Sequence, residues 1–301
     1  MSLGVFPPPA LKRGDTVGIV AMASRVKPEA VHRAIDLLNQ WGLEVIVGES
    51  VFSSHFNYSA PDEVRQRDLQ SMLDNPRVKA IFSARGGYGS SRIVDDLNFY
   101  LFQKSPKWIV GFSDITALHG TLQRLGYQSI HGPMPSTFFQ DTYSTTTLKH
   151  LLWGESFNYT WEMEDLPIRT GSIKAPLVGG NLCLLAHSLG SNSDFSFDQK
   201  ILFLEDVGEA HYALDRYMVQ LRRAGKLQNL AGLILGQFSD MKDPASNFGK
   251  TAEDIVFSHV AKFNFPVVCN FPAGHTKQNY ALPLGRLVQL DITPTQATMR
   301  G

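Results

Sequence analysis

The chain has 301 residues, of which 43% are hydrophobic and 19% charged, a composition typical of globular rather than disordered proteins. Its 28 basic and 28 acidic residues cancel, so the molecule as a whole has no charge that would attract nucleic acid or an anionic membrane. The length is sufficient for two ordinary domains.

Cysteine use and the N-terminal sequence bear on the cellular location. Cys183 and Cys269 lie far apart among apolar neighbours and are interpreted as buried free thiols. The N-terminus has no basic start followed by an apolar run, and no stretch of about eighteen apolar residues occurs. We therefore expect a cytoplasmic protein that has no membrane partner and binds a small or specific ligand.

The first half of the chain alternates strand-like and helix-like patterns. We predict strands at residues 16–22, 43–47, 78–83, 107–112 and 129–131, and helices at residues 28–41 and 61–73. This alternation is typical of a parallel sheet covered by helices on both faces. The expected fold is therefore α/β, with a doubly wound, flavodoxin-like N-terminal domain over residues 1–160.

The stretch 142–170 is rich in Thr, Ser and acidic residues and is interpreted as a linker. Beyond it we predict strands at residues 172–178, 200–204, 231–235, 267–270 and 287–292, and helices at residues 181–188, 209–224 and 251–263. The spacing is less regular than in the first half. A second, mixed α/β domain is expected over residues 161–301, with its topology left open.

Ser113 lies where the apolar run Ile109-Val110-Gly111-Phe112 ends and a helical pattern begins. A serine on a sharp turn between a strand and a helix exposes its hydroxyl, and the N–H groups at the helix start can bind an oxyanion. The same position also suits a helix cap, because serine is a preferred capping residue. Ser113 is therefore a candidate nucleophile or a cap.

A glycine-rich loop, Arg85-Gly86-Gly87-Tyr88-Gly89, follows the predicted third strand. No Gly-Lys-Ser/Thr follows it, and Arg92 occupies the last glycine position of a G-x-G-x-x-G register, so a nucleotide-binding motif is not indicated. Glycines here permit close approach of the backbone to a bound molecule. A plain turn into the next helix is the alternative.

Glu205 ends the apolar run Ile201-Leu202-Phe203-Leu204. Asp206 and Glu209 follow it, and both can be explained as residues that favour a helix N-terminus. Glu205 is harder to explain in this way, since a carboxylate beside four apolar residues risks burial without a partner.

His275 lies in a loop after the strand predicted at 267–270, between Pro272-Ala273-Gly274 and Thr276-Lys277. A lone loop histidine is usually solvated or structural. His32 and His119 lie on predicted helix faces and His211 at a helix start. His131 ends a short strand, from which it could line a cleft.

Ser113, Glu205 and His275 each follow a strand-like run, and α/β proteins build their sites at the carboxyl ends of strands. A nucleophile, a base and an acid that orients the base are the groups that acyl transfer requires. No H-E-x-x-H motif or His/Cys cluster indicates a metal. The usual G-x-S-x-G elbow is absent, because Ile115 replaces its last glycine.

The three segments resemble the LD-carboxypeptidase family of serine peptidases, the muramoyl-tetrapeptide carboxypeptidases. The matching motifs are G-F-S-D-x-T-A-L at 111–118, L-E-D-V-x-E at 204–209 with D-R at 215–216, P-x-G-H at 272–275 and L-P-x-G at 282–285. The R-G-G-Y-G loop at 85–89 matches as well. The likeness extends from about Gly14 to Asp291.

This resemblance implies a cytoplasmic, dimeric enzyme of cell-wall recycling that needs no cofactor or metal and removes the terminal D-alanine from a muropeptide tetrapeptide by cutting an L,D bond. It implies a triad of Ser113, Glu205 and His275. It also implies oxyanion donors at the backbone N–H of Asp114 and of Gly86 or Gly87.

Arg85 and Lys277 could bind substrate carboxylates, although exposed basic residues need no ligand to explain them. Two other functions remain open. One is a relative in the same family that hydrolyses peptidyl-nucleotide antibiotics and confers self-immunity. The other is a small-molecule binding protein without chemistry, in which Ser113 is a helix cap.

Overall fold

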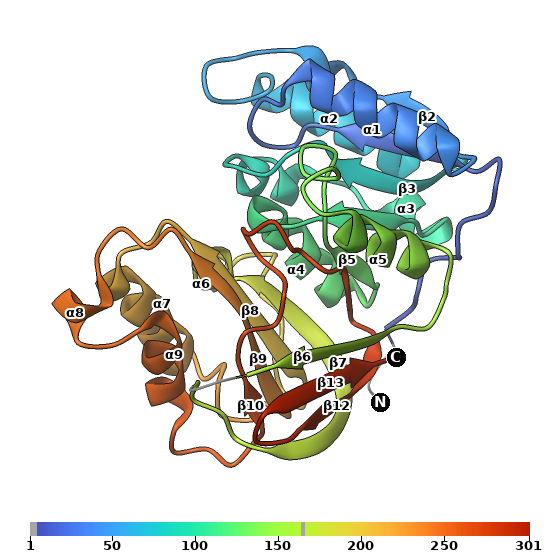
Figure 1. Cartoon of the computed structure of the whole chain (residues 1–301). Coiled ribbons are helices and arrows are strands. Elements are labelled where there is room, and N and C mark those ends of the chain that lie inside the picture. The colour runs from blue at the N-terminus through green and yellow to red at the C-terminus, as the bar shows by residue number, and fades with distance from the viewer. Residues whose placement is uncertain (1–4, 164–165) are drawn as a thin grey trace.

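A six-stranded sheet forms the centre of the first half of the computed structural model, which describes residues 5–163 and 166–301 (Figure 1). Its strand order is β11-β5-β4-β3-β1-β2; β1 to β5 run parallel, and β11 pairs antiparallel with β5. The order 2-1-3-4-5 is that of the flavodoxin-like fold, so the predicted fold class is confirmed. The strands are β1 Thr16–Val20, β2 Glu44–Val47, β3 Val78–Ser83, β4 Trp108–Gly111, β5 Ser129–His131 and β11 Leu282–Leu284.

Helices cover both faces of this sheet. The apolar sides of α1 and α5 pack on one face, and those of α2, α3 and α4 pack on the other. Burial of these stripes at helical spacing explains why the alternating pattern could be recognised in the sequence. The helices are α1 Pro28–Gln40, α2 Asp62–Asp74, α3 Tyr100–Lys104, α4 Thr116–Leu125 and α5 Thr142–Leu152, with short 3₁₀ turns at Glu49–Phe52, Ser90–Arg92, Val94–Asp96 and Ser113–Ile115.

The second half contains a seven-stranded mixed sheet with the order β10-β9-β8-β7-β12-β13-β6. The strands from β7 to β10 are parallel, whereas β7, β12, β13 and β6 pair antiparallel. Helices α6, α7 and α9 cover one face of the parallel part. The elements are β6 Asn158–Glu162, β7 Gly171–Asn181, α6 Leu182–His187, β8 Ile201–Val207, α7 His211–Arg223, β9 Gly232–Ser239, α8 Ala245–Phe248, α9 Ala252–Val260, β10 Val267–Val268, β12 Leu287–Ile292 and β13 Gln296–Arg300.

The two halves share one hydrophobic core. The face of the second sheet that carries Phe203 and Ile234 packs into the same cluster as Phe82 and Phe138 of the first half. The segment after β10 crosses to the first half, where β11 joins the first sheet (Figure 1, red). The division at residues 160 and 161 stays a prediction, and β6 spans it.

The interpretation of residues 142–170 as a linker is wrong where the structure describes them. The stretch contains α5 and β6, and residues 164–165 lie outside the described residues. Helix α5 is rich in Thr, but the hydroxyls of Thr146 and Thr147 bond to carbonyl groups of the helix itself, that of Thr147 to the Ser144 carbonyl at 2.7 Å. Asp141 caps its first turn by accepting the Ser144 N–H, and Leu148, Leu151 and Leu152 supply a buried stripe.

Candidate active site

Ser113 occupies a strained turn directly after β4. Its φ is +64°, in the left-handed region that costs an L-residue about 1–2 kcal/mol. The hydroxyl makes no capping bond to the helix start that follows; in residues 5–163 and 166–301 its hydrogen bond goes to Nε2 of His275, at 2.9 Å. The strain therefore presents the hydroxyl to a side chain from the other half of the molecule.

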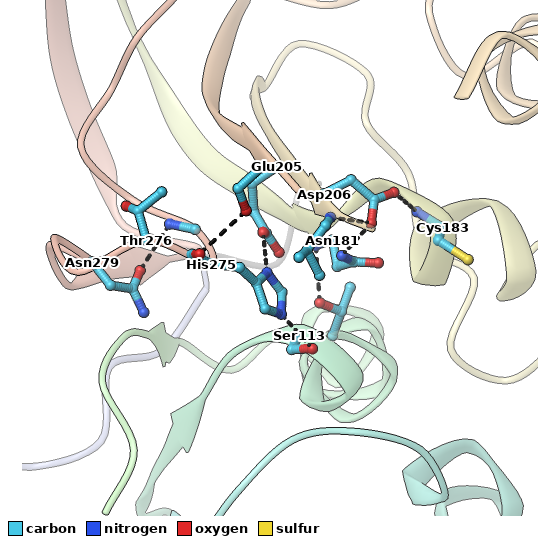
Figure 2. Close-up of polar contacts among 12 residues, drawn as sticks. Ser113, Asn181, Cys183, Glu205, Asp206, His275, Thr276 and Asn279 are labelled. Carbon is cyan, nitrogen blue, oxygen red and sulfur yellow. Dashed lines mark hydrogen bonds and ion pairs between the residues drawn. The ribbon is translucent and has the colours of Figure 1, made fainter. Parts of the chain in front are cut away.

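His275 connects Ser113 to Glu205 (Figure 2). Nδ1 of His275 lies 2.7 Å from Oε2 of Glu205, and Nε2 faces Ser113. Because the carboxylate is only an acceptor, Nδ1 carries the proton and the Nε2 lone pair is left for the serine hydroxyl. The ring packs edge-on against Phe112 at 4.9 Å between ring centroids, which fixes its plane.

The pKa of His275 is set by opposing effects. Burial on its own lowers it. The negative charge of Glu205 and its hydrogen bond act in the opposite direction, and the more distant Asp206 and Asp240 add to them. The net pKa of His275 is raised above its ordinary value of 6.5, as expected for a base whose protonated form is stabilised by a carboxylate.

Glu205 is completely buried, and its side chain reaches His275 through a gap left by a glycine. A Cβ on Gly274 would lie 3.2 Å from both Cβ and Oε2 of Glu205 and 3.1 Å from the Gln237 carbonyl. The φ of Gly274 is +134°, which side chains rarely allow. Glycine is thus required directly before the histidine for the loop to approach the acid.

The other two acidic residues of the segment face away from His275. Strand β8 continues to Val207, so Asp206 points to the opposite side from Glu205; it accepts from Nδ2 of Asn181 at 2.8 Å and from the Cys183 N–H at 3.0 Å (Figure 2). Burial, then the charge of Glu205, raises the pKa of Asp206 to about 7. Glu209 accepts from the Tyr217 hydroxyl at 3.2 Å.

A cavity of about 340 Å³ opens beside Ser113. Residues of both halves line it: Gly87, Tyr88, Ser91, Ser113, Asp114, Asn181, Cys183, Leu184, His187, Asp206, Val207 and Glu209. The volume is in the lower part of the range for small-molecule sites. The sequence reasoning missed Asn181, although the Gly179-Gly180 pair before it, with both residues at positive φ inside β7, marks an unusual strand end.

The glycine-rich loop lies against the serine. A Cβ on Gly86 would lie 3.1 Å from Cβ and 3.3 Å from Oγ of Ser113. The Gly86 carbonyl accepts from the Ser24 N–H at 3.3 Å, so the N–H of Gly87, on the opposite side of the same trans peptide, points away from Ser24. Gly87 and Asp114 both line the cavity, and among the described residues neither N–H donates a backbone hydrogen bond.

Arg85 and Lys277 lie outside this cavity. Arg85 is exposed and donates to the Arg25 carbonyl at 3.0 Å. Lys277 is exposed and lines a separate hollow with Asp141. Within the part of the chain that the structure describes, the cavity beside Ser113 is not lined by either residue.

Two expectations about buried residues need correction. Cys269 is a buried free thiol as expected, but Cys183 is only half-buried and lines the cavity, because it lies in the first turn of α6, where its N–H donates to the Asp206 carboxylate. His131 does not line the cleft; it is fully buried between Phe112 and Phe203. Its strand, β5, lies between β11 and β4 in the sheet, and the Phe112 and Phe203 rings pack against the imidazole.

No group of three or more His, Cys, Asp or Glu side chains that could hold a metal ion occurs within residues 5–163 and 166–301. In the same residues, none of the helices has the length and apolar character needed to cross a bilayer.

Comparisons with known proteins identify relatives that cover almost the whole of this chain. The "Probable murein peptide carboxypeptidase" of Bacillus subtilis (strain 168) is 34% identical over 300 residues, which cover 98% of this chain and 94% of the relative. The crystal structure of a muramoyltetrapeptide carboxypeptidase from Oxalobacter formigenes is 30% identical, with a TM-score of 0.85 over 95% of this chain and 98% of that chain.

A likeness in fold alone extends to the microcin C7 self immunity protein MccF in complex with aspartyl sulfamoyl adenosine, which has a TM-score of 0.85 at 21% identity over 97% of both chains. Family models give a more specific result: the LD-carboxypeptidase N-terminal domain matches residues 17–132, and the LD-carboxypeptidase C-terminal domain matches residues 174–290. Together with the full-length relative from B. subtilis, these matches establish that the chain belongs to the LD-carboxypeptidase family.

Proposed function

We propose that this protein is a serine carboxypeptidase that removes the terminal D-alanine from muropeptide tetrapeptides by hydrolysing an L,D bond. The observation that carries the proposal is the pair of hydrogen bonds from Ser113 through His275 to Glu205 beside a cavity. Membership of the LD-carboxypeptidase family supports the reaction class. The names of the B. subtilis and O. formigenes relatives support a murein-derived peptide as substrate.

In the proposed reaction, Oγ of Ser113 attacks the carbonyl carbon of the third residue while Nε2 of His275 takes the hydroxyl proton. The Glu205 carboxylate stabilises the resulting imidazolium through its 2.7 Å bond to Nδ1. His275 then gives the proton to the amino group of the departing D-alanine, which leaves an acyl-enzyme. Water, deprotonated by His275, hydrolyses the ester and restores Ser113. No cofactor is needed.

The oxyanion of each tetrahedral intermediate is assigned to the N–H groups of Asp114 and Gly87. Both line the cavity, and preorganised N–H donors of this kind lower the barrier of acyl transfer by several kcal/mol. Of the two glycines considered, Gly87 is preferred over Gly86 because Gly87 is the one that lines the cavity. The close contact of Gly86 with Ser113 explains instead why that position has no side chain.

Arg85 and Lys277 are proposed to bind substrate carboxylates at the periphery. Because neither lines the cavity beside Ser113 among the described residues, this role requires a substrate that extends beyond it. Arg85→Ala and Lys277→Ala would then raise KM and leave kcat unchanged. Unaltered KM for both variants with the full muropeptide would remove the two residues from the binding site.

We also propose that the protein acts as a homodimer in the cytoplasm, as the family resemblance implies. Light scattering coupled to gel filtration tests the assembly, and a monomeric mass at micromolar concentration would contradict it. Fractionation of cells that express the native gene tests the location. Recovery in the extracytoplasmic fraction would contradict a cytoplasmic enzyme.

The decisive assay measures release of D-alanine from a tetrapeptide that ends in D-alanine, with Ser113→Ala as the inactive control. An aminoacyl-sulfamoyl adenylate is offered in parallel. Cleavage of the adenylate alone would replace the proposal with hydrolysis of peptidyl-nucleotide antibiotics. Cleavage of neither, with no fluorophosphonate adduct at Ser113, would favour a small-molecule binding protein.

A further inference from the structure

We propose that Asn279, held in place by Ser144 of α5, is a positioning residue that keeps His275 in contact with both Ser113 and Glu205. The inference rests on the proposed function for its role in the reaction. The structural part stands on three hydrogen bonds, from Gly274 to Asn279, from Asn279 to Ser144 and from Ser144 to Asp141, which together connect the His275 loop to the first half of the molecule.

The loop that carries His275 has no regular secondary structure between β10 and β11. Its backbone is fixed by individual hydrogen bonds: the Gln237 N–H donates to the Ala273 carbonyl at 2.9 Å, and Oγ of Ser239 donates to the His275 carbonyl at 3.2 Å. Both hold carbonyl groups to β9. The Gly274 N–H, directly before the histidine, donates to a side chain of the loop itself.

Asn279 supplies that contact. Its side chain is nearly buried, with 4% of the residue exposed, and Oδ1 accepts the Gly274 N–H at 3.1 Å (Figure 2). The bond closes the loop around His275 from the C-terminal side. The same peptide is held on its carbonyl side by the Gln237 N–H, so the two hydrogen bonds together fix its plane.

Ser144 anchors Asn279 in turn. Oγ of Ser144 accepts the Asn279 N–H at 2.8 Å and donates to Oδ2 of Asp141 at 2.6 Å. Asp141 is the N-cap of α5, and Ser144 is buried. The path from Asp141 to Gly274 thus ties the loop of the proposed base to a helix of the half that carries the nucleophile.

This path matters because His275 must satisfy two partners at once, Ser113 at 2.9 Å and Glu205 at 2.7 Å. Without this acceptor the peptide before His275 keeps only its carbonyl bond to Gln237, and the loop that carries the imidazole can shift relative to Ser113. A displacement of about 1 Å between reacting groups costs roughly a factor of 10² in rate. Loss of the Asn279 carbonyl is therefore expected to lower kcat and leave substrate binding in the cavity intact.

The first variant is Asn279→Ala, with Asn279→Asp as its conservative partner, since an aspartate keeps an acceptor for the Gly274 N–H. We expect kcat for D-alanine release to fall about 10²-fold in Asn279→Ala with KM within threefold. The kcat of Asn279→Asp is expected to be at least tenfold higher than that of Asn279→Ala.

The chain offers a matched pair for the anchor. Ser144→Ala removes the acceptor for the Asn279 N–H, whereas Thr147→Ala removes the acceptor for the Ala281 N–H, which is bonded at 3.0 Å and lies on the side of the loop away from Gly274. Both are hydroxyl deletions on α5 that release one backbone N–H. We expect kcat to fall about tenfold or more in Ser144→Ala and to stay within threefold of wild type in Thr147→Ala.

A readout without substrate separates this inference from the proposed function. The Nδ1 proton of His275 bonded to Glu205 gives a downfield proton resonance, which Ser113→Ala should retain and Asn279→Ala should lose or broaden at equal secondary structure by circular dichroism. If wild type releases no D-alanine but the resonance behaves in this way, the proposed function fails and the positioning role stands.

A purely structural role predicts a different outcome: a lowered melting temperature in Asn279→Ala, with kcat and the Nδ1 resonance unchanged. That result would overturn the inference. If Asn279→Ala does not fold, Ser144→Ala and Thr147→Ala decide the question, and equal kcat values in these two variants would overturn it.

Discussion

Replacing Glu205 by Gln is the sharpest test of how the proposed triad works. The change preserves the shape of a side chain that is completely buried and removes its charge. In the wild-type protein Oε2 accepts from Nδ1 of His275 at 2.7 Å, and Oε1 has no partner among the described residues. The glutamine amide must therefore occupy one of two orientations, each of which has a cost.

If the NH₂ group of the new glutamine faces His275, Nδ1 must become the acceptor and the ring proton moves to Nε2. The imidazole then cannot take a proton from Ser113. If the amide oxygen faces His275 instead, the NH₂ group lies where Oε1 now lies without a partner, and an unpaired buried donor costs about 1–3 kcal/mol. Neither orientation supplies the negative charge that stabilises the imidazolium.

The corresponding change in a Ser-His-Asp triad lowers kcat by about 10⁴, and each factor of ten equals about 1.36 kcal/mol of barrier. We expect a loss of about 10³–10⁴ in kcat for Glu205→Gln. The same change also removes a charge that raises the pKa of Asp206, so the pKa of Asp206 should fall from about 7 in a carboxyl-carbon NMR titration. This second readout does not depend on substrate.

Steady-state release of D-alanine, coupled to D-amino-acid oxidase, measures the effect. Glu209→Gln is the matched control, because it removes a carboxylate four residues away whose hydrogen bond goes to Tyr217; its kcat should stay within tenfold of wild type. If Glu205→Gln retains more than a tenth of wild-type kcat and Glu209→Gln has a lower kcat than Glu205→Gln, Glu205 is not the acid that orients His275.

Three further predictions concern the same site. Ser113→Ala and Ser113→Gly should both abolish turnover. In urea titrations the free energy of unfolding of Ser113→Gly should exceed that of Ser113→Ala by about 1 kcal/mol, because glycine relieves the positive φ; equal values would show that the turn is unstrained. His275 must be neutral to act as a base, and its pKa is raised, so kcat/KM should rise with pH around a midpoint above about 6.5. A midpoint below about 6.5 in a profile from pH 5 to 9 would contradict this. Gly87→Ala should lower kcat about 10²–10³-fold, because its Cβ would collide with Oγ of Ser24. Gly126 also has a positive φ but open space around it, so Gly126→Ala should alter only the melting temperature. Similar kcat values in the two variants would remove Gly87 from the oxyanion site.

The first half of the fold could be predicted from the sequence because its signals are local. Each parallel strand is a short apolar run, and α1 carries Val31, Ala34 and Leu38 on one buried stripe. Ser113, Glu205 and His275 were identified for the same reason, since each follows such a run. Their approach to one another could only be expected from topology and from the family resemblance.

Non-local pairing was the part that the sequence did not reveal. Strand β11 has only three residues, includes Pro283 and pairs with β5 about 150 positions earlier. Proline is accepted there because β11 is an edge strand that needs no further partner on one side. A segment this short has no periodicity of its own, so its place depends on the tertiary structure around it.

The choice among the three acidic residues was also decided by structure. Asp206 and Glu209 were explained as first-turn residues of a helix expected from residue 209, but α7 begins at His211 and β8 continues to Val207. Alternation along the strand then separates the two neighbours: Glu205 faces the histidine, and Asp206 faces the cavity. The boundary of one strand thus determines which carboxylate can orient the base.

The positions of the three triad residues require the two halves of the molecule to be firmly docked. Ser113 follows β4 of one sheet, whereas Glu205 lies in β8 of the other and His275 in the loop after β10, so the 2.9 Å contact between Ser113 and His275 exists only while the halves are docked. Phe203, two residues before Glu205, and Phe271, four before His275, are both buried in the core shared with the first half. Packing of the core therefore places the acid and the base relative to the nucleophile before any substrate arrives. A domain motion of about 1 Å would lower the reaction rate, because it would separate His275 from Ser113.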